Sequence, residues 1–171
     1  MPLNLKIKLL REVNPPRKGT LQAAGLDLHT PFPVKAFCNM PPIELDEEGS
    51  PKGVFENGRL PLGISSEFDE GYVGLIMSRS GLGSNQGLHV RNLCGMIDAD
   101  YRGEWQAAIR VDSEQNSGVY TKNQAVLQVI FVPIAEANEF LLEQQDGSVE
   151  NYNAVAGAAV RGDGGFGSTS A

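Results

Sequence analysis

The chain is organised around the ten-residue stretch GMIDADYRGE, residues 95–104. Asp98 and Asp100 are two positions apart, so both carboxylates point to the same face if this segment is an extended strand. Tyr101 then points to the opposite face unless the strand bends, and the glycine two positions later permits a bend or bulge. We predict a β-hairpin over residues 90–101, with a carboxylate on its returning arm and a glycine that lets a flat ligand approach bare backbone. Taken alone, acidic residues near a strand end are interpreted as solvated surface rather than as catalytic groups.

The segments on either side of this stretch have the period of β-strands. Apolar and polar residues alternate over residues 3–9 and again over residues 105–111, which predicts strands with one buried face. Residues 72–77 also have strand composition. Residues 126–132 are apolar except for Gln128, which predicts a strand buried on both faces. With 20 glycines, 10 prolines and almost no helical period, we expect an all-β barrel or sandwich of many short strands.

Length and composition indicate a single globular domain. The 171 residues can bury a sizeable core, and 41% hydrophobic with 20% charged residues is ordinary for such a domain. The net charge of −7 argues against a broad nucleic-acid surface, and no apolar run is long enough to span a membrane. Cys38 and Cys94 have no metal-ligand spacing; a disulfide stays open, but two free thiols in a reducing cytosol are favoured. Because the sequence shows no signal peptide, we expect a cytoplasmic protein.

We expect one domain over residues 1–145, followed by an arm over residues 146–171. Residues 38–59 contain three prolines, an acidic run and three glycines, so this segment is interpreted as a surface excursion inserted into the domain. Residues 136–145 are compatible with either a short helix or a strand. Residues 146–160 are polar and small, and are interpreted as a linker.

A polar turn follows the strand expected at residues 72–77, with the sequence MSRSGLG at residues 77–83. Arg79 offers a guanidinium fork for phosphate, and Ser80 adds a hydroxyl donor. Gly81 frees a backbone N–H for close approach of a ligand. An ordinary polar turn explains the same residues if nothing else in the chain points to phosphate.

The most specific signal is a glycine-rich segment, RGDGGFGST, at residues 161–169. Successive glycine N–H groups can form a nest for anionic oxygens, to which Ser168 and Thr169 add hydroxyls and Arg161 adds positive charge. Phe166 stands among glycines with no obvious core to join, so it suits stacking on a base. The alternative is an unstructured C-terminal tail. Both interpretations hold if the tail becomes ordered over a ligand, as a lid.

These three stretches belong to a set of five that resemble, in the same order, the motifs of the trimeric dUTP pyrophosphatases (dUTPases). The first of the five is AGLDL at residues 24–28, and the fourth is KNQAVLQ at residues 122–128. The second, third and fifth are those at residues 77–83, 95–104 and 161–169. Together they extend from residue 24 to residue 169, nearly the whole chain.

The chain departs from the family pattern at four positions. In the fourth motif, Gln124 and Ala125 replace the usual Asp-Arg pair, so a supporting ion pair is missing. In the fifth, Asp163 replaces the usual Ser or Thr, and Ser170 replaces the usual Gly. Asp163 adds negative charge near the expected phosphates, which would weaken closure of the tail.

The resemblance implies a fold and a reaction. The family fold is a distorted jelly-roll β-barrel (β-clip) that forms a homotrimer, with a C-terminal glycine-rich arm closing over the active site; it favours a strand at residues 136–145. The implied reaction is hydrolysis of dUTP to dUMP and pyrophosphate, which limits uracil incorporation into DNA and supplies dUMP for dTMP synthesis. The implied partners are dUTP, dUMP and further copies of the chain, with no nucleic acid and no membrane.

The resemblance also implies roles for individual residues. Asp98 is the expected general base, which orients a water for in-line attack on the α-phosphorus. Mg²⁺ bridges the phosphates with few or no direct protein ligands, and Asp27 acts on it through water, although an Asp beside a glycine is more often a turn former. The expected substrate-binding residues are Arg79, Ser80, Gly81, Asn92, Gly95, Met96, Ile97, Tyr101, Gln106, Gln128, Arg161, Phe166, Gly167, Ser168 and Thr169.

Uracil is expected to lie against the hairpin over residues 90–101. The Asn92 side chain and backbone groups of residues 95–97 can complement its N3–H donor and its O2 and O4 acceptors. Cytosine reverses that polarity and would leave buried groups unpaired. Tyr101 is expected to pack against the deoxyribose and leave no room for a 2′-hydroxyl, and Gln106 to flank the nucleoside.

Two other interpretations stay open. A dCTP deaminase, sometimes bifunctional, would share the fold, the Arg-Ser turn and the hairpin, but the glycine-rich end with Phe166 and the position of Tyr101 beside Asp98 favour a dUTPase. A dUTPase scaffold can also serve as a regulatory protein, with residues 38–59 as a partner site. A tolerated surface insertion is the favoured interpretation of that segment.

Overall fold

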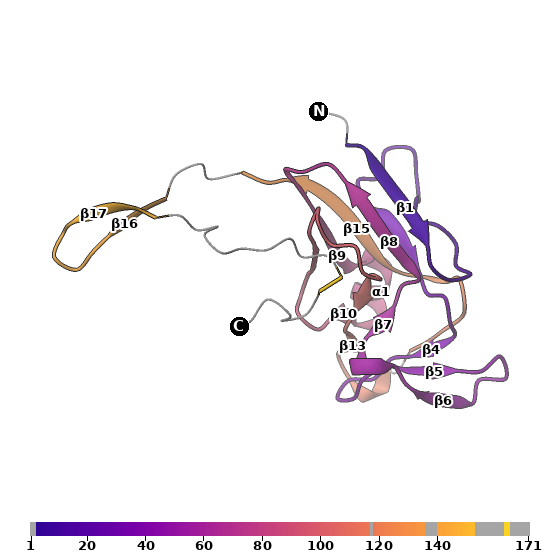
Figure 1. Cartoon of the computed structure of the whole chain (residues 1–171). Coiled ribbons are helices and arrows are strands. Elements are labelled where there is room, and N and C mark those ends of the chain that lie inside the picture. The colour runs from indigo at the N-terminus through magenta and orange to yellow at the C-terminus, as the bar shows by residue number, and fades with distance from the viewer. Residues whose placement is uncertain (1–2, 117, 136–139, 153–162, 165–171) are drawn as a thin grey trace.

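The central strand of the structure is β15 (Ala125–Pro133), which lies in the middle of a five-stranded sheet. It pairs antiparallel with β9 (Tyr72–Ser78) along one edge (Figure 1) and with β3 (Leu26–His29) along the other. The neighbouring residues Val126 and Leu127 are both fully buried, so both faces of the strand are covered there. The prediction of a strand buried on both faces is confirmed for this half of β15, whereas its second half is mostly only half-buried.

The computed structural model describes residues 3–116, 118–135, 140–152 and 163–164. The other strands are β1 (Leu5–Leu9), β2 (Arg17–Lys18), β4 (Val34–Lys35), β5 (Ile43–Leu45), β6 (Pro51–Val54), β7 (Leu60–Pro61), β8 (Ile64–Phe68), β10 (Leu88–Val90), β11 (Gly95–Ile97), β12 (Gln106–Ala107), β13 (Ile109–Val111), β14 (Val119–Tyr120), β16 (Phe140–Glu143) and β17 (Val149–Tyr152). The helical elements are α1 (Ser80–Gln86) and two single 3₁₀ turns, η1 (Glu56–Gly58) and η2 (Glu114–Asn116). Strands therefore dominate the described chain.

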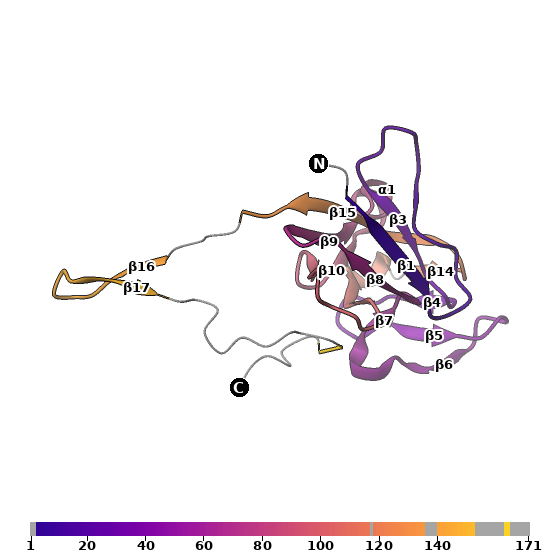
Figure 2. The ribbon, with the colours of Figure 1, turned by 45° about the horizontal axis from the view of Figure 1, so that its top comes forward.

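The strands form small sheets that surround one apolar core, in a distorted barrel (Figures 1 and 2). The order of the five-stranded sheet is β11-β9-β15-β3-β2, and a four-stranded sheet has the order β14-β4-β5-β6. Three further strand pairs complete the barrel: β1 with β8, β7 with β12, and β10 with β13. Trp105 and Tyr120 are the largest fully buried side chains of the core. The all-β prediction is confirmed.

The strands predicted at residues 3–9 and 105–111 are both present, the second in two pieces. β1 pairs with β8 and keeps Leu5 and Ile7 half-buried on one face. The second run changes partner at Ala108, because β12 pairs with β7 whereas β13 pairs with β10. The apolar alternation continues across this change of partner, so the sequence pattern does not reveal it.

The hairpin predicted over residues 90–101 is wrong. Its two arms, β10 and β11, do not pair with each other: β10 pairs with β13, and β11 pairs with β9. The intervening turn is closed by a hydrogen bond from the Leu93 N–H to the Val90 carbonyl at 2.9 Å, with Leu93 at a φ of 66°. Each arm thus gains a partner from elsewhere in the barrel instead of a local one.

The carboxylates of the central stretch do not lie on a strand either. β11 ends at Ile97, and the chain then turns, because the Tyr101 N–H donates to the Asp98 carbonyl at 3.1 Å. The prediction that Asp98 and Asp100 share one face of a strand is therefore wrong. The predicted bend is present at Gly103, and a Cβ at this position would lie 2.5 Å from the Tyr101 hydroxyl. Only a glycine at position 103 lets the tyrosine ring lie against the backbone in this way.

Residues 38–59 form a structured part of the barrel as well as a surface hairpin. β5 pairs with β4, and β6 pairs with β5, so the segment extends the four-stranded sheet. Leu45 and Phe55 are both buried, and Phe55, which directly follows β6, belongs to the apolar core. The tip of the hairpin, which includes Glu47 and Glu48, is exposed. The exposed tip agrees with a surface excursion, but the pairing with β4 and the two buried side chains do not.

The C-terminal part of the described chain contains a second hairpin, in which β16 pairs with β17. Its first strand confirms the strand interpretation for residues 140–143, and residues 136–139 lie outside the described chain. Its second strand contradicts the linker predicted over residues 146–160, of which 153–160 lie outside the described chain. Figures 1 and 2 both show this hairpin apart from the barrel.

Two further expectations concern the cysteines and membranes. Cys38 and Cys94 are free thiols, as the favoured interpretation of the sequence has it. None of the helices in the described part of the chain has the length and apolar character needed to cross a membrane.

Candidate active site

The clearest candidate site lies where β9 ends and α1 begins. Arg79 is the extended N-cap residue of this helix, which ends at Gly87 with a left-handed φ of 64°. The sequence does not predict this helix, because SGLGSNQ has two glycines and no apolar stripe. A cavity of about 340 Å³ opens here (the phosphate cavity below), lined by Asp27, Arg79, Ser80, Gly81, Leu82, Asn85, Gln86 and Gln128. The structure thus brings together predicted site residues from three of the five motifs.

Arg79 is held in one orientation by three hydrogen bonds. Its Nε and Nη2 donate to the two carboxylate oxygens of Asp27 at 2.8 and 3.1 Å, and its Nη1 donates to the Ala125 carbonyl at 3.0 Å. A guanidinium carries five N–H donors, so two are left for an anion in the cavity. The Arg79 side chain is 36% exposed. It is therefore both oriented and accessible, and the immediate role of Asp27 is to orient it.

Gln128 is fixed on the neighbouring strand by a second set of contacts. Its Nε2 donates to the Ser78 carbonyl at 2.8 Å, at the last residue of β9. Its Oε1 faces Gly25, where a Cβ would lie only 2.8 Å away. Gln128 is paired with Asp27 on β3 in the strand register. The first motif therefore contributes two residues to the arrangement of the cavity. Gly25 makes room for Gln128, and Asp27 orients Arg79.

The second part of the candidate site is the turn that follows β11. Asp98 and Asp100 are half-buried there. Tyr101 is only 9% exposed, and its hydroxyl donates to the Glu104 carbonyl at 2.9 Å. Burial raises the pKa of the Tyr101 hydroxyl, and the charges of Asp163 and Glu104 raise it further. The tyrosine is therefore neutral and fixed, with only a small part of its ring open to a ligand.

β11 itself offers backbone groups for recognition. It is the terminal strand of the five-stranded sheet and pairs with β9 along one edge. In the described part of the chain its other edge has no strand partner, so its outward N–H and C=O groups are available to a ligand. The Met96 side chain is 62% exposed, whereas Ile97 is buried. Of the predicted residues 95–97, Gly95 and the buried Ile97 can therefore contribute only their backbone.

The phosphate cavity and the turn after β11 are separate within one chain. The residues that line the cavity include neither Asp98 nor Tyr101, nor any residue of β11. Asn92 lies exposed in the turn between β10 and β11, and Gln106 lies half-buried in β12. The structure of one chain therefore does not bring all the predicted site residues together.

The predicted residues of the glycine-rich tail are Arg161, Phe166, Gly167, Ser168 and Thr169, and all five lie outside the described chain. Asp163 is described, and its charge is among the causes that raise the pKa of Tyr101.

The described residues contain no group of three His, Cys, Asp or Glu side chains arranged to hold a metal ion. Among the described residues, Asp27 is the single carboxylate on the wall of the phosphate cavity, and both of its oxygens already accept hydrogen bonds from Arg79. A metal there would have to take its other ligands from a bound phosphate chain and from water.

Sequence reasoning missed three residues that the structure places at the site. Asn85 and Gln86, the last two residues of α1, line the phosphate cavity. Glu104 connects the turn after β11 to the rest of the barrel, since its backbone carbonyl accepts the Tyr101 hydroxyl. From the sequence, the polar residues six and seven positions after Arg79 can be assigned to the site only if the helix α1, which contains them, is predicted.

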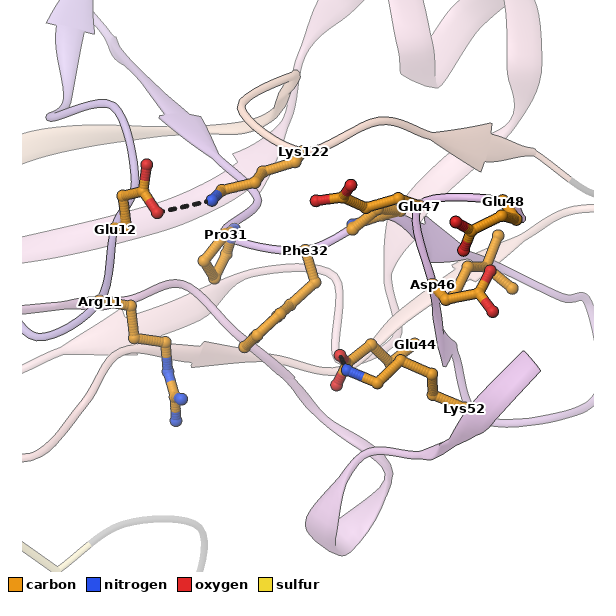
Figure 3. Close-up of a pocket in the computed structure, with 12 residues that line it drawn as sticks. Arg11, Glu12, Pro31, Phe32, Glu44, Asp46, Glu47, Glu48, Lys52 and Lys122 are labelled. Carbon is orange, nitrogen blue, oxygen red and sulfur yellow. Dashed lines mark hydrogen bonds and ion pairs between the residues drawn. The ribbon is translucent and has the colours of Figure 1, made fainter. Parts of the chain in front are cut away.

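A larger cavity, of about 510 Å³, lies beside the hairpin of β5 and β6 (Figure 3). Its lining is partly apolar and partly charged, and consists of Arg11, Glu12, Pro31, Phe32, Pro33, Glu44, Leu45, Asp46, Glu47, Glu48, Lys52 and Lys122. None of the predicted site residues that the structure describes lines it. We refer to it below as the hairpin cavity.

A fixed arginine beside a glutamine at one end of a sheet, together with a free strand edge and a carboxylate turn, defines a site suited to a phosphorylated ligand with a flat polar ring. Comparison with known proteins specifies the family. The dUTPase family model matches residues 50–170. The deoxyuridine 5'-triphosphate nucleotidohydrolase of Anaeromyxobacter sp. strain Fw109-5 is 30% identical over 173 residues, with 99% of each chain covered. The corresponding Pseudomonas paraeruginosa protein is 33% identical over 156 residues, covering 86% of this chain and 95% of the relative. The chain belongs to the dUTPase family.

Solved structures support the same fold. The dUTPase of phage phi11 of S. aureus, described with a structural Mg(II) ion, has a TM-score of 0.62 at 20% identity, covering 84% of this chain and 99% of that one. The dUTPase of Staphylococcus bacteriophage 80alpha has a TM-score of 0.61 at 23% identity, covering 82% and 97%. At these identities the likeness concerns the fold alone.

Proposed function

We infer that the protein hydrolyses dUTP to dUMP and pyrophosphate. The observation that carries this inference is the oriented Arg79, with two N–H donors left for phosphate, in a cavity completed by Gln128. The relatives named as deoxyuridine 5'-triphosphate nucleotidohydrolases specify the nucleotide. A cytoplasmic location belongs to the same proposal, because the reaction would act on the nucleotide pool and supply dUMP for dTMP synthesis.

In the proposed mechanism, Asp98 accepts a proton from a water that attacks the α-phosphorus of dUTP. The new bond joins the water oxygen to the α-phosphorus, and the bond from that phosphorus to the bridging oxygen breaks, so pyrophosphate leaves. The turn closed by the Tyr101 N–H fixes the backbone beside Asp98. Arg79, Ser80 and the backbone of Gly81 would bind the phosphates and stabilise their charge.

Uracil would bind along the free edge of β11. The backbone groups of that edge can accept from the uracil N3–H and donate to its carbonyl oxygens, in the way that a strand edge pairs with another strand. The Asn92 side chain lies in the turn that precedes this edge. Tyr101, held in place by its hydroxyl, would lie against the deoxyribose and exclude a 2′-hydroxyl.

Mg²⁺ is part of the proposal, with Asp27 as its outer contact through water. The fit rests on the position of this carboxylate on the cavity wall, where it is 19% exposed, next to the predicted phosphate ligands. When bound, the ion would neutralise charge on the phosphate chain. In the protein, Arg79 and Gln128 would orient the phosphate chain.

We further propose that the protein is a homotrimer with shared active sites. Each site would take the phosphate cavity from one chain, the Asp98 turn from a second and the glycine-rich arm from a third. The absence of Asp98 and Tyr101 from the lining of the phosphate cavity supports this arrangement. The arm over residues 146–171 would act as a lid over the bound nucleotide.

The function is tested by measuring pyrophosphate release from dUTP, dTTP, dCTP and UTP, together with ammonia release from dCTP. We expect pyrophosphate from dUTP alone at a substantial rate. Ammonia from dCTP would indicate a deaminase instead, and no turnover of any nucleotide would contradict the proposal.

The shared site is tested by mixing two inactive chains. Asp98→Asn and a chain truncated before Arg161 are each expected to be nearly inactive alone. If turn and arm come from different chains, a mixed trimer can form a complete site. The truncated chain then supplies the intact turn with Asp98, and the Asp98→Asn chain supplies the intact arm. Random closed assembly of equal amounts should restore about a quarter of wild-type sites. If mixed trimers are present by mass but no more active than the parents, the shared-site model is wrong.

A further inference from the structure

Glu104 links the turn after β11 to a distant part of the barrel. Its two carboxylate oxygens accept hydrogen bonds from Nε and Nη2 of Arg11, at 2.7 and 2.9 Å. The Gly63 N–H also donates to Glu104 Oε1, at 2.9 Å. The Glu104 side chain is 17% exposed. A bidentate pair with an added backbone donor fixes the position of this carboxylate more closely than a single ion pair could.

The backbone of the same residue holds Tyr101. The Tyr101 hydroxyl donates to the Glu104 carbonyl at 2.9 Å, and Gly103 between them leaves room for the ring. The next residue, Trp105, is fully buried, and its N–H donates to the Ile64 carbonyl at 2.8 Å. Glu104 therefore stands between a fixed core residue and the tyrosine, and its side chain is a second anchor for the peptide group whose carbonyl accepts the Tyr101 hydroxyl.

Arg11 is itself well positioned for this role. Its backbone N–H donates to the Gly63 carbonyl at 3.3 Å, and its guanidinium lies 5.4 Å from the centroid of the Phe32 ring, at the edge of the hairpin cavity (Figure 3). The hydrogen bond to Glu104 raises the pKa of Arg11 above its ordinary value. The guanidinium is therefore charged at every working pH, and it contacts both Glu104 and an aromatic ring.

We propose that Arg11 is a positioning residue for sugar selection, which acts through Glu104 on Tyr101. This inference rests on the proposed function, in which Tyr101 excludes a 2′-hydroxyl. Arg11 does not line the phosphate cavity, so it acts by fixing the Glu104 carbonyl that accepts the Tyr101 hydroxyl. When Arg11 is lost, the tyrosine ring gains freedom, and a ribonucleotide is admitted more readily.

The test compares Arg11→Met and Arg11→Lys with Lys122→Met. Lys122 is the control, because it lines the same cavity and forms an ion pair with the exposed Glu12, at 2.9 Å, rather than with Glu104. The measurement is the ratio of kcat/KM for dUTP to kcat/KM for UTP. We expect Arg11→Met to lower this ratio about tenfold. Arg11→Lys should lower it nearly as far, because an ammonium cannot form the planar bidentate contact, whereas Lys122→Met should leave it unchanged.

A second measurement does not depend on turnover. Hydrogen exchange of the segment 99–105 should be faster in Arg11→Met than in the wild type or in Lys122→Met. An unchanged nucleotide ratio in folded Arg11 variants, or unchanged exchange in this segment, would overturn the inference. If the wild type does not hydrolyse dUTP, the proposed function fails, but the exchange measurement still decides whether Arg11 fixes the turn. Glu104→Gln provides a second variant if Arg11→Met does not fold, with faster exchange as the expected result.

Discussion

Substitution of Gly103 by Ala should destabilise the protein through one residue, Tyr101. A Cβ at position 103 would lie 2.5 Å from the Tyr101 hydroxyl oxygen, 2.7 Å from Cζ and 2.9 Å from Cε2. All three distances are shorter than carbon contacts tolerate, so the ring must move. The ring is 9% exposed and belongs to the apolar core, which limits where it can go.

The expected magnitude has two parts. Overpacking of a core site costs roughly 1–3 kcal/mol, and loss of the 2.9 Å hydrogen bond from Tyr101 to the Glu104 carbonyl costs about 1 kcal/mol. The free energy of unfolding should therefore fall by about 2–4 kcal/mol. For a chain of this length, that corresponds to a decrease in Tm of roughly 5–15 °C.

A double-mutant cycle with Tyr101→Ala isolates the cause. If the clash is the cause, Gly103→Ala should cost less than about 0.5 kcal/mol in the Tyr101→Ala background, because the ring is no longer there. Gly81→Ala is the matched control, since a Cβ there meets nothing within 4 Å and the residue lies in α1. It should be neutral or slightly stabilising. Denaturant unfolding at one fixed protein concentration gives all four values. An equal cost of Gly103→Ala in both backgrounds would refute the reasoning.

Three further predictions concern catalysis and binding. Asp98→Asn should retain nucleotide binding but lose on the order of 10²-fold or more in kcat, because an amide cannot accept the proton; steady-state kinetics with near-normal kcat would end the general-base assignment. Tyr101→Ala should raise turnover of UTP relative to dUTP, since the filter at C2′ is gone, and an undiminished dUTP/UTP ratio would show that Tyr101 is not the sugar gate. Phe166→Ala should weaken nucleotide binding by roughly 1–3 kcal/mol, the usual worth of base stacking, while leaving the ligand-free Tm almost unchanged; calorimetry and thermal melts measure both, and a large loss of ligand-free stability would place Phe166 in the core.

The sequence predicts those strands whose residues are decided by burial. β15 was predictable because an apolar run interrupted only by Gln128 requires a strand that is covered on both faces where it begins. The same holds for β1 and β9, whose composition matches their burial. In these elements the local pattern and the tertiary environment agree.

The pairing of strands was not predictable in the same way. β10 and β11 are separated by a short turn, which favours a hairpin on local grounds, but their partners β13 and β9 come from elsewhere in the chain. The helix α1 was not predicted for a related reason. Its glycines and serines have poor helix propensity, and the helix is held by its position between β9 and β10. Non-local contacts determine both features.

For the candidate site, the sequence identified the residue types but not their contacts. Arg79 and Gln128 were found from the motifs, whereas the orientation of Arg79 by Asp27 depends on β3 and β9 flanking the same strand. The roles of Gly25 and Glu104 depend on distances of closest approach between segments far apart in the chain. Such distances leave no local trace in the sequence.

The register of β15 has a consequence for how chains of this kind can vary in length. Gln128 stands opposite both Asp27 on β3 and Met77 on β9, so one rung of the sheet aligns the phosphate cavity. A register slip of one residue in the regular part of β15, from Leu127 onward, would turn every later side chain to the other face, removing the cavity and exposing the apolar core in one step. The hairpin of β5 and β6 ends in an exposed tip and shares no rung with that sheet. Length variation can therefore accumulate in the hairpin over generations, while the central strand keeps its count of residues.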